Sequence, residues 1–89
     1  MISRPATIVN KLGLHARAAT RLVNCASMFE AQLLIKKGEK TINGKSIMGI
    51  LTLAASKGTE LVIEADGHDQ EKALHAICEL IDDRFGEDE

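Results

Sequence analysis

Alternation of apolar and polar residues predicts four β-strands in this chain. In segment 60–65 the apolar Leu61, Ile63 and Ala65 share one face and two glutamates lie on the other, a pattern typical of a half-buried strand. Shorter runs rich in β-branched and aliphatic residues predict three further strands, at residues 6–9, 31–36 and 40–43. Pro5 precedes the first of them and favours an edge position, where a missing N–H costs least. Gly38-Glu39 predicts a type II′ hairpin turn.

Apolar residues at intervals of three and four predict three helices. The first, at 16–28, has its apolar stripe at Ala19, Leu22, Ala26 and Phe29, with Ala18 and Cys25 beside it. The second covers 47–55, is very apolar, and should end before Gly58. The third begins after a predicted cap at Asp69 and stops at Gly86. We expect the acidic residues 87–89 to form a frayed tail.

The element order is therefore strand, helix, strand, strand, helix, strand, helix. The strands and the helices each have their apolar residues on one face. This pattern predicts an α+β fold, a two-layer sandwich whose antiparallel sheet carries the helices on one face. No internal repeat or linker interrupts the 89 residues, so we expect a single domain over 1–89.

Composition excludes several classes of function. The net charge of −2 and the presence of only two aromatic residues argue against a nucleic-acid partner. There is no run of about 20 apolar residues and no signal-peptide pattern, which argues against membrane insertion and favours a cytoplasmic protein. Cys25 and Cys78 lie far apart in helical patterns and are interpreted as buried thiols rather than a disulfide. No cluster has metal-ligand spacing, so neither a metal nor a cofactor is predicted.

His15 is the first candidate for chemistry. It follows Gly13 at a predicted helix start, where three or four N–H groups lack partners within the helix. Histidine is a poor cap, so we expect these donors to remain available to an anion. Arg17 lies in the first turn, where the helix dipole favours an acid instead. Phosphate carried on the imidazole would explain both features, whereas a lone surface histidine without a role is the alternative.

Ser46 and the apolar residues after it form the second candidate. Ser46 suits a helix N-cap, and this alone could explain it. A phosphate there would add up to about two negative charges, which makes Ser46 a candidate regulatory site. The helix that follows has more apolar residues than one short helix can bury, which favours an exposed docking patch over a fully buried helix.

Two motifs carry a family resemblance. The segment Gly13–Ala19 (GLHARAA), followed by Asn43–Gly49 (NGKSIMG), is similar to the HPr family, the histidine-containing phosphocarriers of the bacterial phosphotransferase system. The resemblance covers essentially the whole chain. It implies the open-faced HPr sandwich and a relay of phosphoryl groups rather than a stand-alone catalyst.

The resemblance also implies roles for individual residues. Nδ1 of His15 would accept a phosphoryl group from phospho-enzyme I and pass it to a histidine of an enzyme IIA domain. Arg17 and the backbone of Ala16 would bind the phosphoryl group. Ser46 would be the target of an HPr kinase/phosphorylase where one exists. The expected partner surface comprises Arg21, Ile47, Met48 and Leu51, on a monomer.

The chain departs from the family pattern in three ways. Ala18 stands where the family usually has proline, and Gly49 stands where many relatives have lysine. Many sugar-pathway members also have lysines further along the first helix, where this chain has Asn24 and Ser27 and keeps only Arg21. With fewer basic residues near the predicted partner surface, the electrostatic attraction of acidic partners is weaker. Sugar transport, a nitrogen-related branch and a purely regulatory protein that acts by binding therefore remain open alternatives. An autonomous hydrolase is the weakest, because no second catalytic acid or base lies near His15 in the sequence.

Overall fold

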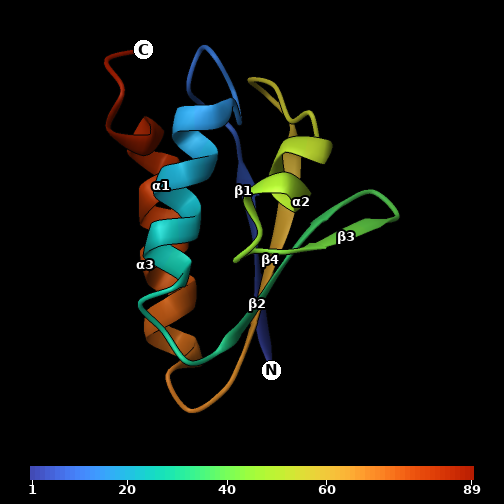
Figure 1. Ribbon diagram of the computed structural model, residues 1–89, viewed down its shortest axis with the longest axis vertical. Coiled ribbons are helices and arrows are strands. Elements are labelled where there is room, and N and C mark those ends of the chain that lie inside the picture. The colour runs from blue at the N-terminus through green and yellow to red at the C-terminus, as the bar shows by residue number, and fades with distance from the viewer.

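The computed structural model describes all residues 1–89 and shows two layers, a sheet and a layer of helices (Figure 1). The elements follow the predicted order: β1 (Ile2–Thr7), α1 (Ala16–Ala26), β2 (Gln32–Lys37), β3 (Lys40–Asn43), α2 (Ile47–Thr52), β4 (Glu60–Asp66), α3 (Gln70–Asp82) and a short 3-10 turn, η1 (Arg84–Gly86). The predicted α+β fold class is confirmed.

The sheet has the strand order β1-β4-β2-β3, and all neighbours are antiparallel. β1 is an edge strand, as Pro5 indicated, but it covers residues 2–7 and not 6–9. Ile8 lies beyond the strand and is fully buried, and its N–H donates to the Thr59 carbonyl oxygen at 3.0 Å. Ile8 is apolar and is buried in the core, although it lies outside the strand. The prediction from apolar residues therefore placed the strand too far along the chain. Gly38 has φ 59° in the two-residue turn between β2 and β3, as a type II′ turn requires.

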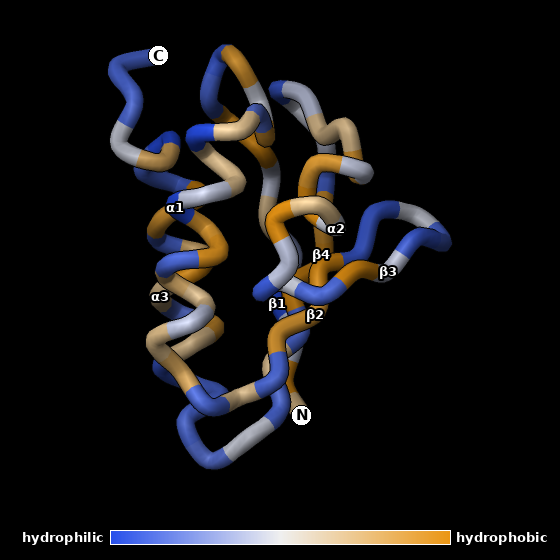
Figure 2. Tube along the Cα trace, viewed as in Figure 1, coloured by the Kyte–Doolittle hydropathy of each residue, from blue (hydrophilic) through white to orange (hydrophobic).

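The core lies between the sheet and the helices and contains 22 buried apolar residues. Figure 2 shows apolar stretches in the strands, and polar residues in the turn between β2 and β3 and in the loop between β4 and α3. The predicted alternation in β4 is confirmed, because Leu61, Ile63 and Ala65 are all buried. α1 contributes mainly small side chains, which let the helix approach its neighbours closely: Ala18, Ala19, Leu22 and Ala26.

The helices are shorter than the sequence pattern predicts. α1 ends at Ala26 and α2 at Thr52, so Gly58 does not end α2. Ala54 follows α2 with φ 49°, a left-handed conformation that breaks the helix before Ala55. Asp69 precedes α3 but makes no side-chain cap; its carboxylate instead accepts the N–H groups of Glu30 and Ala31 at 2.9 and 2.8 Å.

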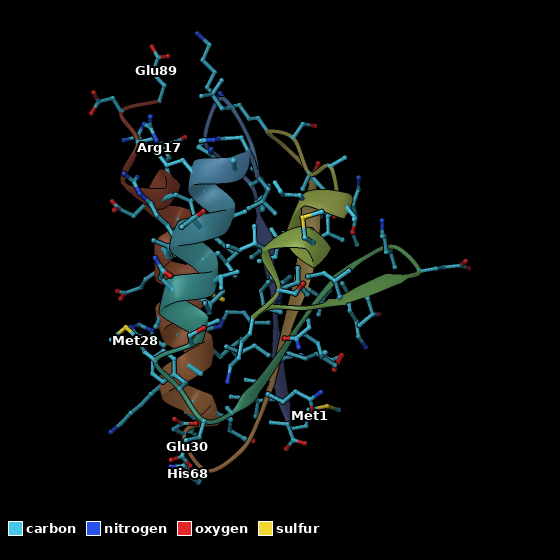
Figure 3. All side chains as sticks on the ribbon, viewed as in Figure 1. Met1, Arg17, Met28, Glu30, His68 and Glu89 are labelled. Carbon is cyan, nitrogen blue, oxygen red and sulfur yellow. The ribbon has the colours of Figure 1, made fainter.

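The two chain termini lie at opposite ends of the molecule (Figure 1). The start of α1 and the C-terminal tail share one end, where Arg17 and Glu89 lie, while Glu30 and His68 lie at the other (Figure 3). None of the helices has the length and apolar character needed to span a bilayer.

Candidate functional site

A glycine-dependent loop places His15 at the start of α1. Gly13 has φ 70°, and a Cβ there would lie 2.4 Å from the Ala55 carbonyl oxygen. The next N–H, of Leu14, donates to that same oxygen at 2.8 Å. The loop is therefore pressed against the segment after α2, and only glycine allows this contact. His15 follows in extended conformation as the N-cap of α1.

Both ring nitrogens of His15 have partners. Nδ1 accepts the Arg17 N–H at 3.2 Å, so the expectation that histidine would leave the cap open is wrong in part. Nε2 is paired with the Glu87 carboxylate. A ring nitrogen that accepts an N–H carries no proton, so neutral His15 has its proton on Nε2. The His15 side chain is 28% exposed, and the lone pair of Nδ1 faces the helix start.

The expectation of a frayed C-terminal tail is wrong. Glu87 is 11% exposed at its side chain and accepts the Asn10 Nδ2 group at 2.9 Å as well as His15. The Lys11 N–H donates to the main-chain oxygen of Glu89 at 2.6 Å, and the Lys11 ammonium pairs with the Glu89 side chain at 3.3 Å. Charge complementarity between the loop and the tail is the physical reason that the tail docks.

Burial by itself would raise the pKa of Glu87. Hydrogen bonds from Asn10 and His15 and the charges of His15 and Arg17 outweigh that effect, so the pKa lies below its ordinary value. Glu87 is therefore ionised at neutral pH and presents a full negative charge to the imidazole.

Arg21 helps to direct the tail toward His15. Its guanidinium donates to the Phe85 carbonyl, so this predicted partner-binding residue is engaged within the chain. Arg84, Phe85 and Gly86 all have left-handed backbone, with φ of 56°, 54° and 77°. Two consecutive non-glycine residues in this region cost roughly 1–2 kcal/mol each. Full burial of the Phe85 side chain offsets this cost and reverses the chain onto the loop.

An open cleft of about 510 Å³ lies between the loop, α1 and the tail. Arg17 is exposed on its wall and makes no ion pair, so its guanidinium is free to meet an anion. Charged residues of both signs dominate the lining, which comprises Lys11, Leu12, Arg17, Arg21, Gly86, Glu87, Asp88 and Glu89.

The first turn of α1 supplies further donors. The N–H groups of Ala16 and Ala18 have no acceptor within the helix, as in the first turn of any α-helix. Ala18 is fully buried at its side chain, and its N–H is one that a proline at this position would lack. The departure at Ala18 therefore adds a donor at this end of the helix.

The second candidate site lies on α2, beside α1 (Figure 1). Ser46 is the N-cap, and its Oγ accepts the Gly49 N–H at 3.0 Å. Met48 is 72% exposed and Ile47 is also exposed, whereas Leu51 is half-buried and Ile50 is fully buried. The expected surplus of apolar side chains on α2 is thus present at the surface. We call Ile47, Met48 and Leu51 the α2 patch.

The remaining reactive side chains lie apart from the cleft. His68 and His75 are exposed and pair at the surface with Glu30 and Glu79. Cys25 and Cys78 are both free, and burial raises the pKa of each thiol. They therefore stay protonated and poorly nucleophilic. No group of acidic, histidine and cysteine side chains could hold a metal ion.

Sequence reasoning missed Asn10 and Glu87, although both belong to the His15 environment. Asn10 is the one fully buried polar side chain, and its Nδ2 group donates to Gly13 and to Glu87. The signal that could have suggested the arrangement is the basic Lys11 and Arg17 near His15 together with an acidic C-terminus. Attraction between them opposes fraying.

Comparisons with known proteins identify the family of the chain. A family model described as "PTS HPr component phosphorylation site" matches residues 2–83. Phosphocarrier protein HPr of Neisseria meningitidis is 45% identical over 89 residues, with 100% of both chains covered. Phosphocarrier protein NPr of Shewanella violacea is 45% identical over 86 residues, covering 97% of this chain and 94% of that protein.

Two structures of HPr from Thermoanaerobacter tengcongensis resemble the fold. The structure named HPr-C-His has a TM-score of 0.96 and 43% identity, with 100% of both chains covered. A structure named as an HPr dimer has a TM-score of 0.79 and 46% identity, covering 90% of this chain and 92% of that one.

Proteins named as phosphocarriers, and their fold, are thus matched along the whole chain. The protein belongs to the HPr family of the phosphotransferase system. Membership implies that it works with phosphotransfer partners.

Proposed function

We propose that the chain carries a phosphoryl group on Nδ1 of His15, accepted from phospho-enzyme I and passed to a histidine of an enzyme IIA domain. The observation that carries this proposal is the Nδ1 lone pair at the N-terminus of α1, left unprotonated by the Arg17 N–H. A nucleophilic nitrogen needs this lone pair. The protein acts as a relay, and each partner supplies the rest of its transfer site.

The phosphoryl group has donors within reach of its place of attachment. When Nδ1 binds phosphorus, it can no longer accept the Arg17 N–H, which is then free to bond a phosphoryl oxygen. The N–H groups of Ala16 and Ala18 and the exposed Arg17 guanidinium add charge-assisted and dipolar stabilisation.

The α2 patch serves as the docking surface for both partners, and Ser46 beside it is the regulatory position. Exposed Met48 supplies adaptable apolar contact area. A phosphate on Ser46, added by an HPr kinase/phosphorylase, places about two negative charges beside this surface and opposes docking. Arg21 takes part in docking only where a partner displaces it from Phe85.

The test is incubation with phosphoenolpyruvate and enzyme I, followed by assay of acid-labile phosphate on the protein. His15→Ala should abolish uptake, whereas His75→Ala, a matched change at an exposed histidine of α3, should take up one equivalent. Uptake by His15→Ala would refute the proposal.

The nitrogen-related branch is the second candidate, favoured by the similarity to an NPr protein. Measuring phosphoryl transfer to sugar-type and nitrogen-type IIA domains distinguishes the two branches.

We also propose that the protein is a cytoplasmic monomer. Light scattering across a concentration series tests the oligomeric state directly, since a dimer would double the mass.

A further inference from the structure

The His15 ring is held between two partners that demand the same tautomer. The Arg17 N–H points at Nδ1, at 3.2 Å, and the Glu87 carboxylate is paired with Nε2. A carboxylate only accepts hydrogen bonds, and a backbone N–H only donates them. The tautomer with the proton on Nδ1 would lose both contacts at once. Neutral His15 therefore keeps the Nδ1 lone pair available.

The Asn10 side chain holds the Glu87 carboxylate in place by a hydrogen bond. The Asn10 side chain is fully buried, and its Nδ2 group donates to the Gly13 carbonyl and to Glu87 Oε1, both at 2.9 Å. A flipped amide would place its oxygen against two acceptors, so the orientation of the amide follows from its neighbours. Asn10 thus ties the loop before His15 to the carboxylate behind the ring.

The backbone of the tail is held by contacts other than the hydrogen bond between Asn10 and Glu87. Lys11 binds Glu89 on one side of Glu87, and Arg21 binds Phe85 on the other. The left-handed turn at Arg84–Gly86 reverses the chain so that residue 87 faces the loop. Strained backbone at a site, compensated by a buried anchor, is typical of a residue whose position matters.

We infer that Glu87 is a positioning residue, seated by Asn10, that fixes the tautomer and orientation of the His15 ring for phosphoryl transfer. The inference rests on the proposed function. As the Nδ1 lone pair forms the N–P bond, the bond between phosphorus and the donor breaks and its electron pair leaves with the donor. The ring gains positive charge, and its Nε2 proton stays in place. The Glu87 carboxylate stabilises that charge through the Nε2–H bond.

The decisive variant is Glu87→Gln. Asn10 and His15 bind different oxygens of the Glu87 carboxylate, and glutamine replaces one of these oxygens with an NH2 group, which cannot accept a hydrogen bond. We expect the ¹⁵N chemical shifts of the ring at about pH 8, where a histidine is neutral, to report only the Nε2–H tautomer in the wild type. The variant should show a mixture. The rate of transfer from bound phospho-enzyme I should fall on the order of tenfold, with unchanged affinity for that partner.

Glu79→Gln is the matched control, because Glu79 pairs with His75 on the surface of α3. It should change neither the His15 shifts nor the transfer rate. The inference is overturned if Glu87→Gln retains a single tautomer, if its transfer rate is unchanged, or if transfer becomes faster. The tautomer is measured on the unphosphorylated protein alone. A wild type that shows the Nε2–H tautomer but takes up no phosphate would instead refute the proposed function.

Discussion

The N-termini of α1 and α2 carry the two side chains proposed to be phosphorylated, and they satisfy their free N–H groups differently. His15 caps α1 through Nδ1, at 3.2 Å from the Arg17 nitrogen, whereas Ser46 caps α2 through Oγ, at 3.0 Å from the Gly49 nitrogen. A phosphoryl group on Nδ1 removes the cap of α1. A phosphate on Oγ leaves oxygens that still accept the N–H. Under the proposed function, the His15 site therefore exchanges one acceptor for another, and the Ser46 site keeps its acceptor.

The support of the two caps also differs. Ser46 relies on its own turn, while His15 relies on contacts distant in sequence, with Ala55 through Gly13 and with Glu87. A local cap survives changes elsewhere in the chain, but a cap built from tertiary contacts does not. The His15 site should be the more easily disturbed of the two, and four changes test this difference.

Gly13→Ala should have the largest effect. The new Cβ would meet the Ala55 carbonyl oxygen at 2.4 Å and would stand on a backbone with φ 70°. We expect a loss of at least about 2 kcal/mol in the free energy of unfolding, measured by urea denaturation. Gly58→Ala is the control, since φ there is 91° but nothing lies within 4 Å of a Cβ. Equal losses in both variants would mean that the contact with Ala55 contributes nothing.

Ser46→Asp should slow transfer from phospho-enzyme I on the order of tenfold, because its charge lies beside the α2 patch. Ser46→Asn provides the comparison, since asparagine caps a helix as well as aspartate does and carries no charge. It should transfer at close to the wild-type rate. The difference should shrink at high salt, where surface charges are screened. A salt-independent defect would point to altered packing of α2 instead.

Ser46→Ala should cost about 1 kcal/mol of stability through loss of the α2 cap. His15→Ala should cost less, because its capping bond is longer and its ring is partly solvated. Thermal unfolding of the two variants at neutral pH gives the comparison. The reverse order would show that the His15 contacts contribute more to stability than the Ser46 cap.

Acidification should weaken the contacts of the Glu87 side chain with Asn10 and His15, with the smallest effect on the whole fold. The pKa of Glu87 lies below its ordinary value of 4.5, so its contribution to stability is complete above that pH. It is lost as the pH falls further and the carboxylate takes up a proton. The NMR signals of the Asn10 side-chain amide, whose Nδ2 group donates to Glu87, should shift as the carboxylate takes up its proton. Glu87→Gln should not show this shift.

Much of the fold could be predicted because it follows from patterns local to each element. Leu61, Ile63 and Ala65 alternate, and all three face the core. Errors arose where tertiary contacts overrode the pattern: Ile8 is buried outside any strand, and α2 stops at Thr52 because Ala54 turns left-handed. Helical spacing carries no information about either event.

The parts of the candidate site that depend on local sequence could be predicted, and the contacts between distant segments could not. His15 and Ser46 lie at helix starts because glycine and cap residues mark those starts in the sequence. The contact of the Arg21 guanidinium with the Phe85 carbonyl, 64 residues away, was not predicted. Glu87 was missed for a related reason. A contact 72 residues apart in sequence depends on the left-handed turn at Arg84–Gly86, which no local pattern signals.

The opposite placement of the chain ends decides how the protein can be labelled. Met1 lies at the far end, where its ammonium group pairs with Asp66 at 3.6 Å, whereas Glu89 contacts Lys11 beside His15. A fusion or dye attached after Glu89 would crowd the tail next to its contacts with Lys11. The same attachment at Met1 would leave the His15 end untouched. Assays with immobilised or fluorescent protein should therefore use the N-terminus.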